Sequence, residues 1–304
     1  MDFPKNQKIA ILAGGPSCER EISLVSGKAV YEALKSEGLD VLLMDPAADF
    51  LQQLRHEGIR QVFLALHGTF GEDGTIQEML EGEGIIYTGS GPLASALAFD
   101  KARAQRLFRD NGLAVPEFQI FGSVQPIRPE AIRLPAVVKP ASSGSSVGVT
   151  LVFERNRIVA AAEEAFRYSN EILIEEYIEG RELTVGILGD RALPVVEIVP
   201  GEKFYDFKAK YQDSRTRYEA PAHLESAIAA QVQRLALDAF GLLGCRGMAR
   251  ADVILGACGP VLLEVNTIPG MTGKSLLPKA AKATVIEFAQ LCLEILRLPD
   301  QKNT

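Results

Sequence analysis

Four polar side chains stand at alternate positions in the stretch RADVILGACGPVLLEVN, residues 250–266. Arg250 and Asp252 belong to one apolar segment, and Glu264 and Asn266 to the next, with a short turn between them. Residues two apart on a strand share a face, so each pair can point into one cleft. Two carboxylates and an amide oxygen suit Mg²⁺, which also takes phosphates and water. The sequence therefore predicts a magnesium site at Asp252, Glu264 and Asn266. A solvent-exposed strand face, with Asn266 forming the following turn, is the alternative.

A second stretch with chemical potential is KPASSGSSVGV, residues 139–149, in which Lys139 precedes four serines and two glycines. Glycine and serine let backbone N–H groups approach an anion closely, and a lysine at a strand end adds positive charge. The stretch therefore predicts a phosphate-binding loop. A flexible surface hairpin would have a similar composition.

Strands and helices are expected to alternate in the first hundred residues, and they could position some of these side chains. Apolar runs rich in β-branched residues alternate with stretches of helical period, and Gly14-Gly15 follow the first run. Strands that alternate with helices form a parallel, doubly wound sheet. The expected strands are 8–13, 40–45, 61–66 and 84–89, and the expected helices are 20–37, 47–57 and 75–82.

The architecture changes after about residue 100, where prolines begin to recur. A smaller α+β unit comes first, and a third region starts near residue 183. Residues 200–221 show neither period, and a loop that long in a compact domain is usually functional. We expect domains at 1–100, 101–182 and 183–304. The later elements expected are strands at 118–121, 136–140, 148–153, 171–178, 183–188, 193–199, 248–255 and 260–266, and helices at 155–167, 224–242 and from about 282.

Composition narrows the class of function. The 304 residues carry a net charge of −7 with a pI of about 5.2, which argues against nucleic acid and anionic membranes as partners, because both need clustered Lys and Arg. The N-terminal apolar run is typical of a strand rather than a signal peptide, and no run reaches the ~18 apolar residues of a membrane helix. The cysteines lack metal-site spacing, which indicates reduced, mostly buried thiols in a cytoplasmic enzyme: Cys18, Cys245, Cys258 and Cys292.

Two short motifs resemble nucleotide-binding signatures but lack their context. GSGPLA, residues 89–94, matches a loose dinucleotide pattern, yet the acid about 20 residues later, Asp110, falls at a helix end. GMTGKS, residues 270–275, contains the end of a phosphate loop, but Ile268 stands where that motif needs glycine. Neither a nicotinamide-binding protein nor a P-loop NTPase is therefore expected.

Taken together, the remaining motifs resemble those of the ATP-grasp enzymes, and most closely the D-alanine–D-alanine ligase family, over nearly the whole chain. The resemblance implies an α/β protein, α+β overall, with an N-terminal doubly wound parallel domain followed by a two-lobed ATP-grasp fold. It also accounts for YTGSG without a dinucleotide. Besides the metal trio and the 139–149 loop, the stretches that match are GGPSCEREISL (14–24), ALHGTFGEDGTIQ (65–77), YTGSGPLASALAFDK (87–101), LIEEYIEGRE (173–182), FYDFKAKY (204–211) and EVNTIPGMT (264–272).

The resemblance implies that ATP is a substrate and that residues 139–149 fold over its phosphates. Lys101 and Lys139 would contact the phosphates, and N–H groups near Ser145 and Ser146 would close over them. For the three acids of the 173–182 stretch, Glu175, Glu176 and Glu182, a solvated strand edge is the alternative interpretation. The other contacts carried over are Lys210 for the transferred phosphoryl group, Glu175 and the backbone of Glu176 and Ile178 for adenine, and Glu182 for the ribose.

The activity implied is ATP-dependent joining of two D-alanines through an acylphosphate, for peptidoglycan synthesis. Two Mg²⁺ ions, replaceable by Mn²⁺, would be held by the metal trio, with Glu264 bridging both. The oxyanion of the second step would be stabilised by Arg250 and the N–H of Gly270. A cytoplasmic homodimer is the family's usual form.

Further roles carried over from the family concern the two D-alanines. Glu19 would hold the ammonium of the first, although an acid there also suits a helix N-terminus. His67 would lie near the second, although a lone loop histidine is often structural. Ser275 and the N–H of Leu276 would bind the carboxylate of the second D-alanine. Tyr211 would form a hydrogen-bonded trio with Ser145 and Glu19. A tyrosine at this position favours an amine acceptor over D-lactate.

Two positions depart from the family pattern. Glu78 replaces a usual glycine, which concerns helix packing, and Gly273-Lys274 replaces a common Ser-His, which puts a lysine near the acceptor carboxylate. The rival functions are a ligase of the same fold that uses D-lactate or D-serine, and a nucleotide-binding regulator without turnover. The intact site residues argue against the regulator: Arg250, Asp252, Glu264, Asn266 and Lys210.

Overall fold

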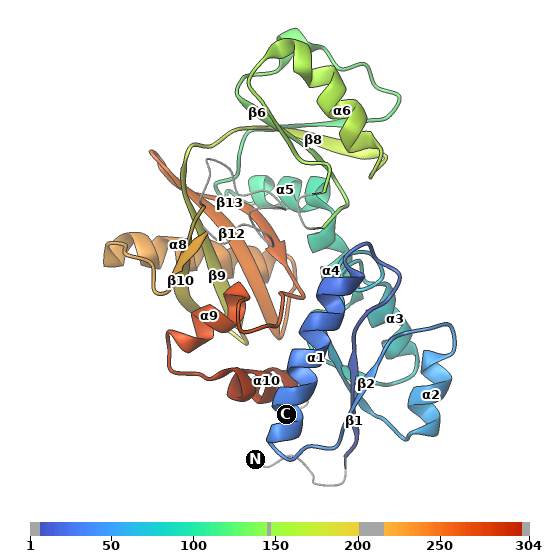
Figure 1. The fold of residues 1–304 in the computed structure, drawn as a ribbon. Coiled ribbons are helices and arrows are strands. Elements are labelled where there is room, and N and C mark those ends of the chain that lie inside the picture. Colours follow the sequence, from blue (N-terminus) through green and yellow to red (C-terminus); the bar gives the residue numbers. More distant parts are fainter. Residues whose placement is uncertain (1–6, 145–146, 201–215, 300–304) are drawn as a thin grey trace.

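The computed structural model describes residues 7–144, 147–200 and 216–299. These residues form three sheets that follow one another along the chain (Figure 1), and residues of all three units line one cleft. Four of the predicted site residues lie outside the described residues: Ser145, Ser146, Lys210 and Tyr211.

The first sheet is parallel throughout and has the strand order β2-β1-β3-β4. The predicted parallel α/β unit is therefore confirmed: the two central strands, β1 and β3, are fully buried, and helices connect the strands. Helix α1 lies close to β1, and a methyl group added at Gly27 would overlap the side chain of Ala13. The elements are β1 (Ile9–Leu12), α1 (Arg20–Ser36), β2 (Val41–Met44), α2 (Phe50–His56), β3 (Gln61–Leu64), α3 (Thr75–Gly82), β4 (Ile86–Tyr87), α4 (Pro92–Phe99) and α5 (Lys101–Asp110).

The second sheet is antiparallel and small, with the order β5-β8-β6-β7. One helix covers its apolar face through Ile158 and a row of alanines. The single helix expected over 155–167 is wrong in detail, because a 3₁₀ turn at Arg155–Arg157 precedes the α-helix. The elements are β5 (Phe118–Gly122), a 3₁₀ turn (Pro129–Ala131), β6 (Ala136–Pro140), β7 (Thr150–Val152), α6 (Ile158–Phe166) and β8 (Glu171–Glu176).

The third sheet is antiparallel with the order β11-β10-β9-β12-β13. Two expectations were wrong here. The stretch 200–221 contains a short strand that pairs with β10, and the closing helix is two helices, because α9 ends where one helix was expected to start. The elements are β9 (Gly180–Leu188), β10 (Arg191–Val199), β11 (Arg217–Glu219), α8 (Ser226–Leu242), β12 (Met248–Gly256), β13 (Gly259–Asn266), α9 (Leu276–Lys282) and α10 (Phe288–Arg297).

The first and third units share one hydrophobic core. Helix α10 returns to pack against α1 (Figure 1), and its Leu291 and Leu296 belong to the same buried cluster as the strands of the first sheet. Gln61 Nε2, at the start of β3, donates to the carbonyl of Leu296 at 2.7 Å. The second unit has its own separate apolar cluster around Ile158 and Ile172.

The cysteines are free thiols, as expected, but only half of them are buried. Cys18 and Cys258 are exposed, whereas Cys245 and Cys292 lie in the core. Burial raises the pKa of the Cys245 thiol to about 11 and that of the Cys292 thiol to about 12. Among the described residues, no helix is long and apolar enough to cross a membrane.

One exposed turn is strained. Val285, between α9 and α10, has φ of 67° and is 87% exposed, a conformation that costs a β-branched residue about 1–2 kcal/mol. We expect Val285→Gly to raise the free energy of unfolding by about 1 kcal/mol. Glycine relieves the backbone strain, and this gain exceeds the cost of the additional chain entropy that glycine loses on folding. Thermal unfolding measures this. Val159→Gly, which places glycine in α6, should destabilise the protein, and equal destabilisation by both changes would contradict the prediction.

Candidate active site

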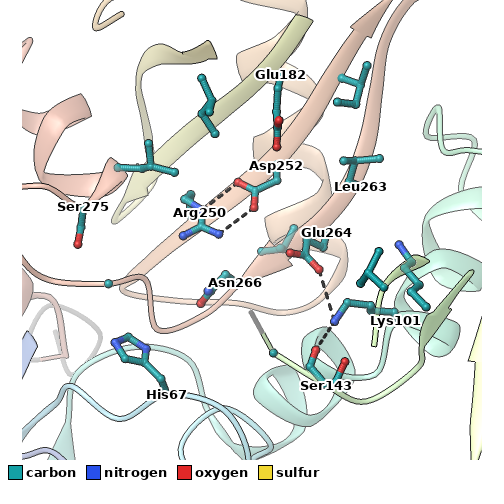
Figure 2. Close-up of a pocket in the computed structure, with 18 of the residues that line it drawn as sticks. His67, Lys101, Ser143, Glu182, Arg250, Asp252, Leu263, Glu264, Asn266 and Ser275 are labelled. Carbon is teal, nitrogen blue, oxygen red and sulfur yellow. Dashed lines mark hydrogen bonds and ion pairs between the residues drawn. The ribbon is translucent and has the colours of Figure 1, made fainter. Parts of the chain in front are cut away.

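A cleft of about 780 Å³ lies where the three units meet. Its walls come from the turn after β1, the loop after β3, the β6–β7 loop, the end of β8, strands β12 and β13, and the segment before α9 (Figure 2). The described predicted site residues all line it: Glu19, His67, Lys101, Lys139, Glu175, Glu176, Ile178, Glu182, Arg250, Asp252, Glu264, Asn266, Gly270, Ser275 and Leu276.

Strand register brings the four polar residues of β12 and β13 together. Arg250 pairs across the ladder with Asn266, and Asp252 pairs with Glu264. Arg250 donates to Asp252 through Nε and Nη2, both at 2.8 Å, and Thr184 Oγ1, from β9, donates to Asp252 Oδ1 at 2.7 Å. The alternation predicted from sequence therefore forms a wall of the cleft rather than a solvent face.

The donor set of this wall fits Mg²⁺. Asp252 Oδ1 accepts two hydrogen bonds, from Arg250 Nε and from Thr184 Oγ1. Asp252 Oδ2 accepts only one, from Arg250 Nη2, and so keeps a lone pair for a metal ion. Asn266 Oδ1 accepts from the N–H of Ile268 at 3.0 Å and also keeps a lone pair. Within the described residues no three His, Cys, Asp or Glu side chains form a metal cage, so the protein offers few ligands. Mg²⁺ is commonly bound in this way, with phosphates and water completing its shell.

Two lysines enter the cleft from neighbouring elements, α5 and β6, and the N–H of Lys101 donates to the carbonyl of Ala141, just after β6. Lys101, the first residue of α5, donates from Nζ to the Ser143 carbonyl at 2.6 Å and lies 3.4 Å from Glu264 Oε2 (Figure 2). Lys139, at the end of β6, pairs with Glu175 Oε2 at 2.7 Å, with both side chains at least nine-tenths buried. Positive charge therefore lies between the β6–β7 loop and the acids of β13.

Glu175 and its neighbours form the part of the cleft next to β8. Glu175 is 3% exposed, so the solvated strand edge is wrong for this residue. Its Oε1 has no hydrogen-bond partner among the described residues, as expected of an acceptor reserved for a ligand. The Glu176 N–H already donates to the Glu117 carbonyl, and Glu182 lies on β9 beside Asp252 (Figure 2).

Glu19 and His67 follow β1 and β3, where the strand order of the first sheet reverses. Ligands of open α/β sheets bind at such switch points. The turn that carries Glu19 is held by Asp45, which accepts from the Gly15 N–H at 2.9 Å and pairs with Arg20. The Arg20 guanidinium lowers the pKa of the Asp45 carboxyl.

The phosphate-loop candidate and the Glu19 turn touch. Glu19 is 6% exposed and directly precedes α1, without a side-chain hydrogen bond to that helix. A methyl group added at Gly144 would overlap the Glu19 carboxylate. The described part of this loop therefore reaches the first unit at Gly144, which does not fit a free surface hairpin.

His67 belongs to a buried hydrogen-bonded chain that the sequence did not predict. Its Nδ1 lies 3.4 Å from Glu72 Oε1 and its Nε2 lies 3.2 Å from Ser26 Oγ. Ser26 also accepts from the Met271 N–H at 3.3 Å. A helical pattern could have suggested Ser26, since it lies two turns after Glu19 on the same face of α1.

The segment after β13 supplies the last wall. Gly270 and Ser275 line the cleft, and Ser275 directly precedes α9, as predicted. Ser275 Oγ accepts from the Thr272 N–H at 3.1 Å and lies 2.9 Å from Thr272 Oγ1. Lys274 lines the cleft beside it. Ser275 therefore already has protein partners, while Leu276 begins the helix.

Sequence comparison matches the chain to two family models. Residues 107–297 match "D-ala D-ala ligase C-terminus" and residues 44–90 match "D-ala D-ala ligase N-terminus". The D-alanine–D-alanine ligase of Citrifermentans bemidjiense is 47% identical over 299 residues, 98% of both chains. That of Bordetella pertussis is 47% identical over 296 residues, 95% of this chain and 94% of the relative.

Solved structures show the same likeness in three dimensions. The D-alanine–D-alanine ligase of Bacillus anthracis complexed with ATP superposes with a TM-score of 0.87 and 29% identity, over 97% of this chain and 98% of that one. The VanG D-Ala:D-Ser ligase of Enterococcus faecalis has a TM-score of 0.83 and 30% identity, over 97% and 99% of the two chains. From its matched residues, its relatives and its three-sheet fold, this chain belongs to the D-alanine–D-alanine ligase family.

Proposed function

We propose that this protein joins two molecules of D-alanine to D-alanyl-D-alanine, with ATP converted to ADP and phosphate. The observation that carries the proposal is the meeting of Arg250, Asp252 and Glu264 with Lys101 and Lys139 in one cleft. The first three are arranged for a metal and a developing oxyanion, and the lysines for phosphates. Family membership supplies the substrates, D-alanine and ATP.

In the first step a carboxylate oxygen of one D-alanine attacks the γ-phosphorus, and the bond to ADP breaks, which gives an acylphosphate. Lys101 and Lys139 would bind the phosphate oxygens, and Glu19 the ammonium of this D-alanine. Because Lys101 Nζ contacts both the Ser143 carbonyl and Glu264, it ties the phosphate loop to the metal wall.

Asp252, Glu264 and Asn266 would hold two Mg²⁺ ions, or Mn²⁺, which would offset phosphate charge and align the reacting oxygens. The protein prepares this wall before any ion binds. Arg250 and Thr184 fix the Asp252 carboxylate from one side, so its remaining lone pair is pre-oriented. Glu175 and Glu182, beside the backbone of Glu176 and Ile178, would bind adenine and ribose.

In the second step the amine of another D-alanine attacks the acyl carbon, phosphate leaves, and the amine loses a proton. The tetrahedral oxyanion would accept hydrogen bonds from Arg250 and the Gly270 N–H, and the acceptor carboxylate would meet Ser275 and the Leu276 N–H. His67 lies near this region (Figure 2). The roles of Ser145, Ser146, Lys210 and Tyr211 stay predictions.

Incubation with ATP, Mg²⁺ and D-alanine, with products separated by mass, tests the function. We expect ADP, phosphate and D-alanyl-D-alanine in equal amounts. Replacing the acceptor by D-lactate or D-serine tests the rival ligases, and a faster reaction with either would reassign the acceptor. Absence of ADP release in all three mixtures would favour the regulator.

Other features of the proposal follow from membership of the family. They are a role in peptidoglycan synthesis, a homodimeric state, a cytoplasmic location and domain boundaries near residues 100 and 182. Size-exclusion chromatography with light scattering measures the oligomeric state.

The lysine that departs from the family pattern leads to a further prediction. Lys274 lines the cleft one residue before Ser275, where it adds positive charge near the proposed acceptor carboxylate. At pH 8 we expect Lys274→His to raise the KM of the acceptor D-alanine roughly 5-fold, the factor given by loss of one nearby exposed charge. Lys282→His, an exposed change on α9 away from the cleft, is the control. Equal acceptor KM in the parent and the Lys274 variant would reject this role.

A further inference from the structure

The chain of hydrogen bonds through Ser26 connects parts of the sequence that are far apart. Ser26 lies on α1 of the first unit, His67 follows β3, and Met271 follows β13, 245 residues after Ser26. Ser26 and Met271 are fully buried, and His67 is 5% exposed. Met271 directly follows Gly270, whose N–H is proposed to stabilise the oxyanion.

One donor fixes the direction of the whole chain. The Met271 N–H can only donate, so Ser26 Oγ accepts at 3.3 Å. The hydroxyl has a single hydrogen, and the partner left for it in the described part of the chain is His67 Nε2, at 3.2 Å. Nε2 must then be the accepting nitrogen, which leaves the ring hydrogen on Nδ1, facing Glu72 Oε1 at 3.4 Å.

We infer that Ser26 is a positioning residue for the ligation step, which, together with Glu72, holds the His67 ring in one tautomer and orientation and ties it to the segment that carries Gly270. The inference deepens the proposed ligase function and rests on it. Ser26 is buried and does not need to touch a substrate. Its effect is to hold two groups from different units, the imidazole and the Gly270–Met271 backbone, in one fixed relation.

The same geometry predicts which substrate's kinetic constants change when Ser26 loses its hydroxyl. ATP binds at the opposite part of the cleft in this proposal, against β6 and β8, whereas His67 and Gly270 belong to the acceptor part. Removing the Ser26 hydroxyl frees the imidazole and leaves the buried Met271 N–H without its partner. Small misplacements of positioned groups reduce rates by up to about 100-fold. We therefore expect Ser26 variants to lower kcat/KM for D-alanine and to leave KM for ATP nearly unchanged.

The first test is nitrogen NMR of the ring of His67 in the intact protein near neutral pH. The chain has three histidines, and the signal that disappears in His67→Gln identifies the ring. We expect a proton on Nδ1 and none on Nε2 in the parent, and a shifted Nε2 signal in Ser26→Ala, because Nε2 then loses the hydrogen bond that it accepts from Ser26. A proton on Nε2 in the parent would overturn the inference, whatever the variant does.

The second test is steady-state kinetics of Ser26→Ala. We expect kcat/KM for D-alanine to fall about 10- to 100-fold, with KM for ATP changed less than about 2-fold. Ser26→Thr, which keeps a hydroxyl, should recover part of the loss. Parental kinetics with D-alanine in a folded Ser26→Ala protein would overturn the inference.

Ser23 provides a matched control on the same helix. It is equally buried, and its hydroxyl donates to the Ala65 carbonyl at 2.7 Å and accepts from the Gly14 N–H at 2.8 Å, without touching His67. Ser23→Ala should lose comparable stability and leave the Nε2 signal of His67 unchanged, and an equal shift of that signal would count against a specific role for Ser26. If the parent releases no ADP with D-alanine, the proposed function fails, while the NMR result still stands on its own.

Discussion

Arg250→Met is expected to lose about 10²–10³-fold in kcat, the usual cost of removing one oxyanion donor. Arg250 is 8% exposed and its guanidinium is held by two hydrogen bonds to Asp252, so it is oriented before substrate arrives. Arg250→Lys keeps the charge beside Asp252 but not the planar pair of donors. We expect it to unfold near the parental temperature and still lose at least about 10-fold in rate.

The control for this prediction is an arginine of the same sheet. Arg181 also forms a two-pronged pair, with Glu197 at 2.7 and 2.5 Å, so Arg181→Met reports what loss of such a pair does to thermal unfolding. Comparison of the two unfolding curves separates structural damage from lost catalysis. A folded Arg250→Met protein within about 3-fold of the parental kcat would contradict the proposed role.

The second large effect concerns the ion pair between Lys139 and Glu175. Both side chains are at least nine-tenths buried, and removing one member of such a pair typically costs about 3–5 kcal/mol, because the other charge stays buried without a partner. We expect Lys139→Met to destabilise the protein by this amount. Differential scanning calorimetry should show the loss in the transition that includes the second unit.

A double variant distinguishes a buried charge from simple loss of packing. Lys139→Met with Glu175→Leu replaces both charges by apolar groups, so most of the stability should return. Neither variant should turn over ATP at the parental rate, since both lack the proposed phosphate contact. Equal destabilisation by the single and double variants would show that the isolated Glu175 charge is not the cause.

Much of the fold could be predicted because its signals are local. The apolar runs around Ile9 and Val62 and the glycine turn after β1 specify a parallel unit without knowledge of any distant residue. The helix boundaries near residue 282 could not be predicted in this way. There Leu277 and Leu291 are buried against the first unit, so tertiary packing, and not periodicity, decides where α9 ends and α10 begins.

The residues of the site also divide into those with a local sequence signal and those placed by tertiary contacts. Arg250, Asp252, Glu264 and Asn266 could be grouped from sequence, because alternation on a hairpin is a local property. Ser26 could not be linked to His67, since its role depends on a hydrogen bond from Met271 at the far end of the chain. Family resemblance identified His67 but not the residues that hold it.

The shared core of the first and third units has a mechanical consequence. Glu19, His67, Arg250 and Asp252 sit on opposite faces of one continuous apolar interior, so they cannot separate without exposing it to water. The unit that carries Lys139 and Glu175 has most of its apolar side chains in a separate cluster, so a shift of that unit would leave the shared interior covered. The groups proposed for the amino acids and the metal are thus anchored to one interior, and the pair proposed for the nucleotide is anchored mainly to another.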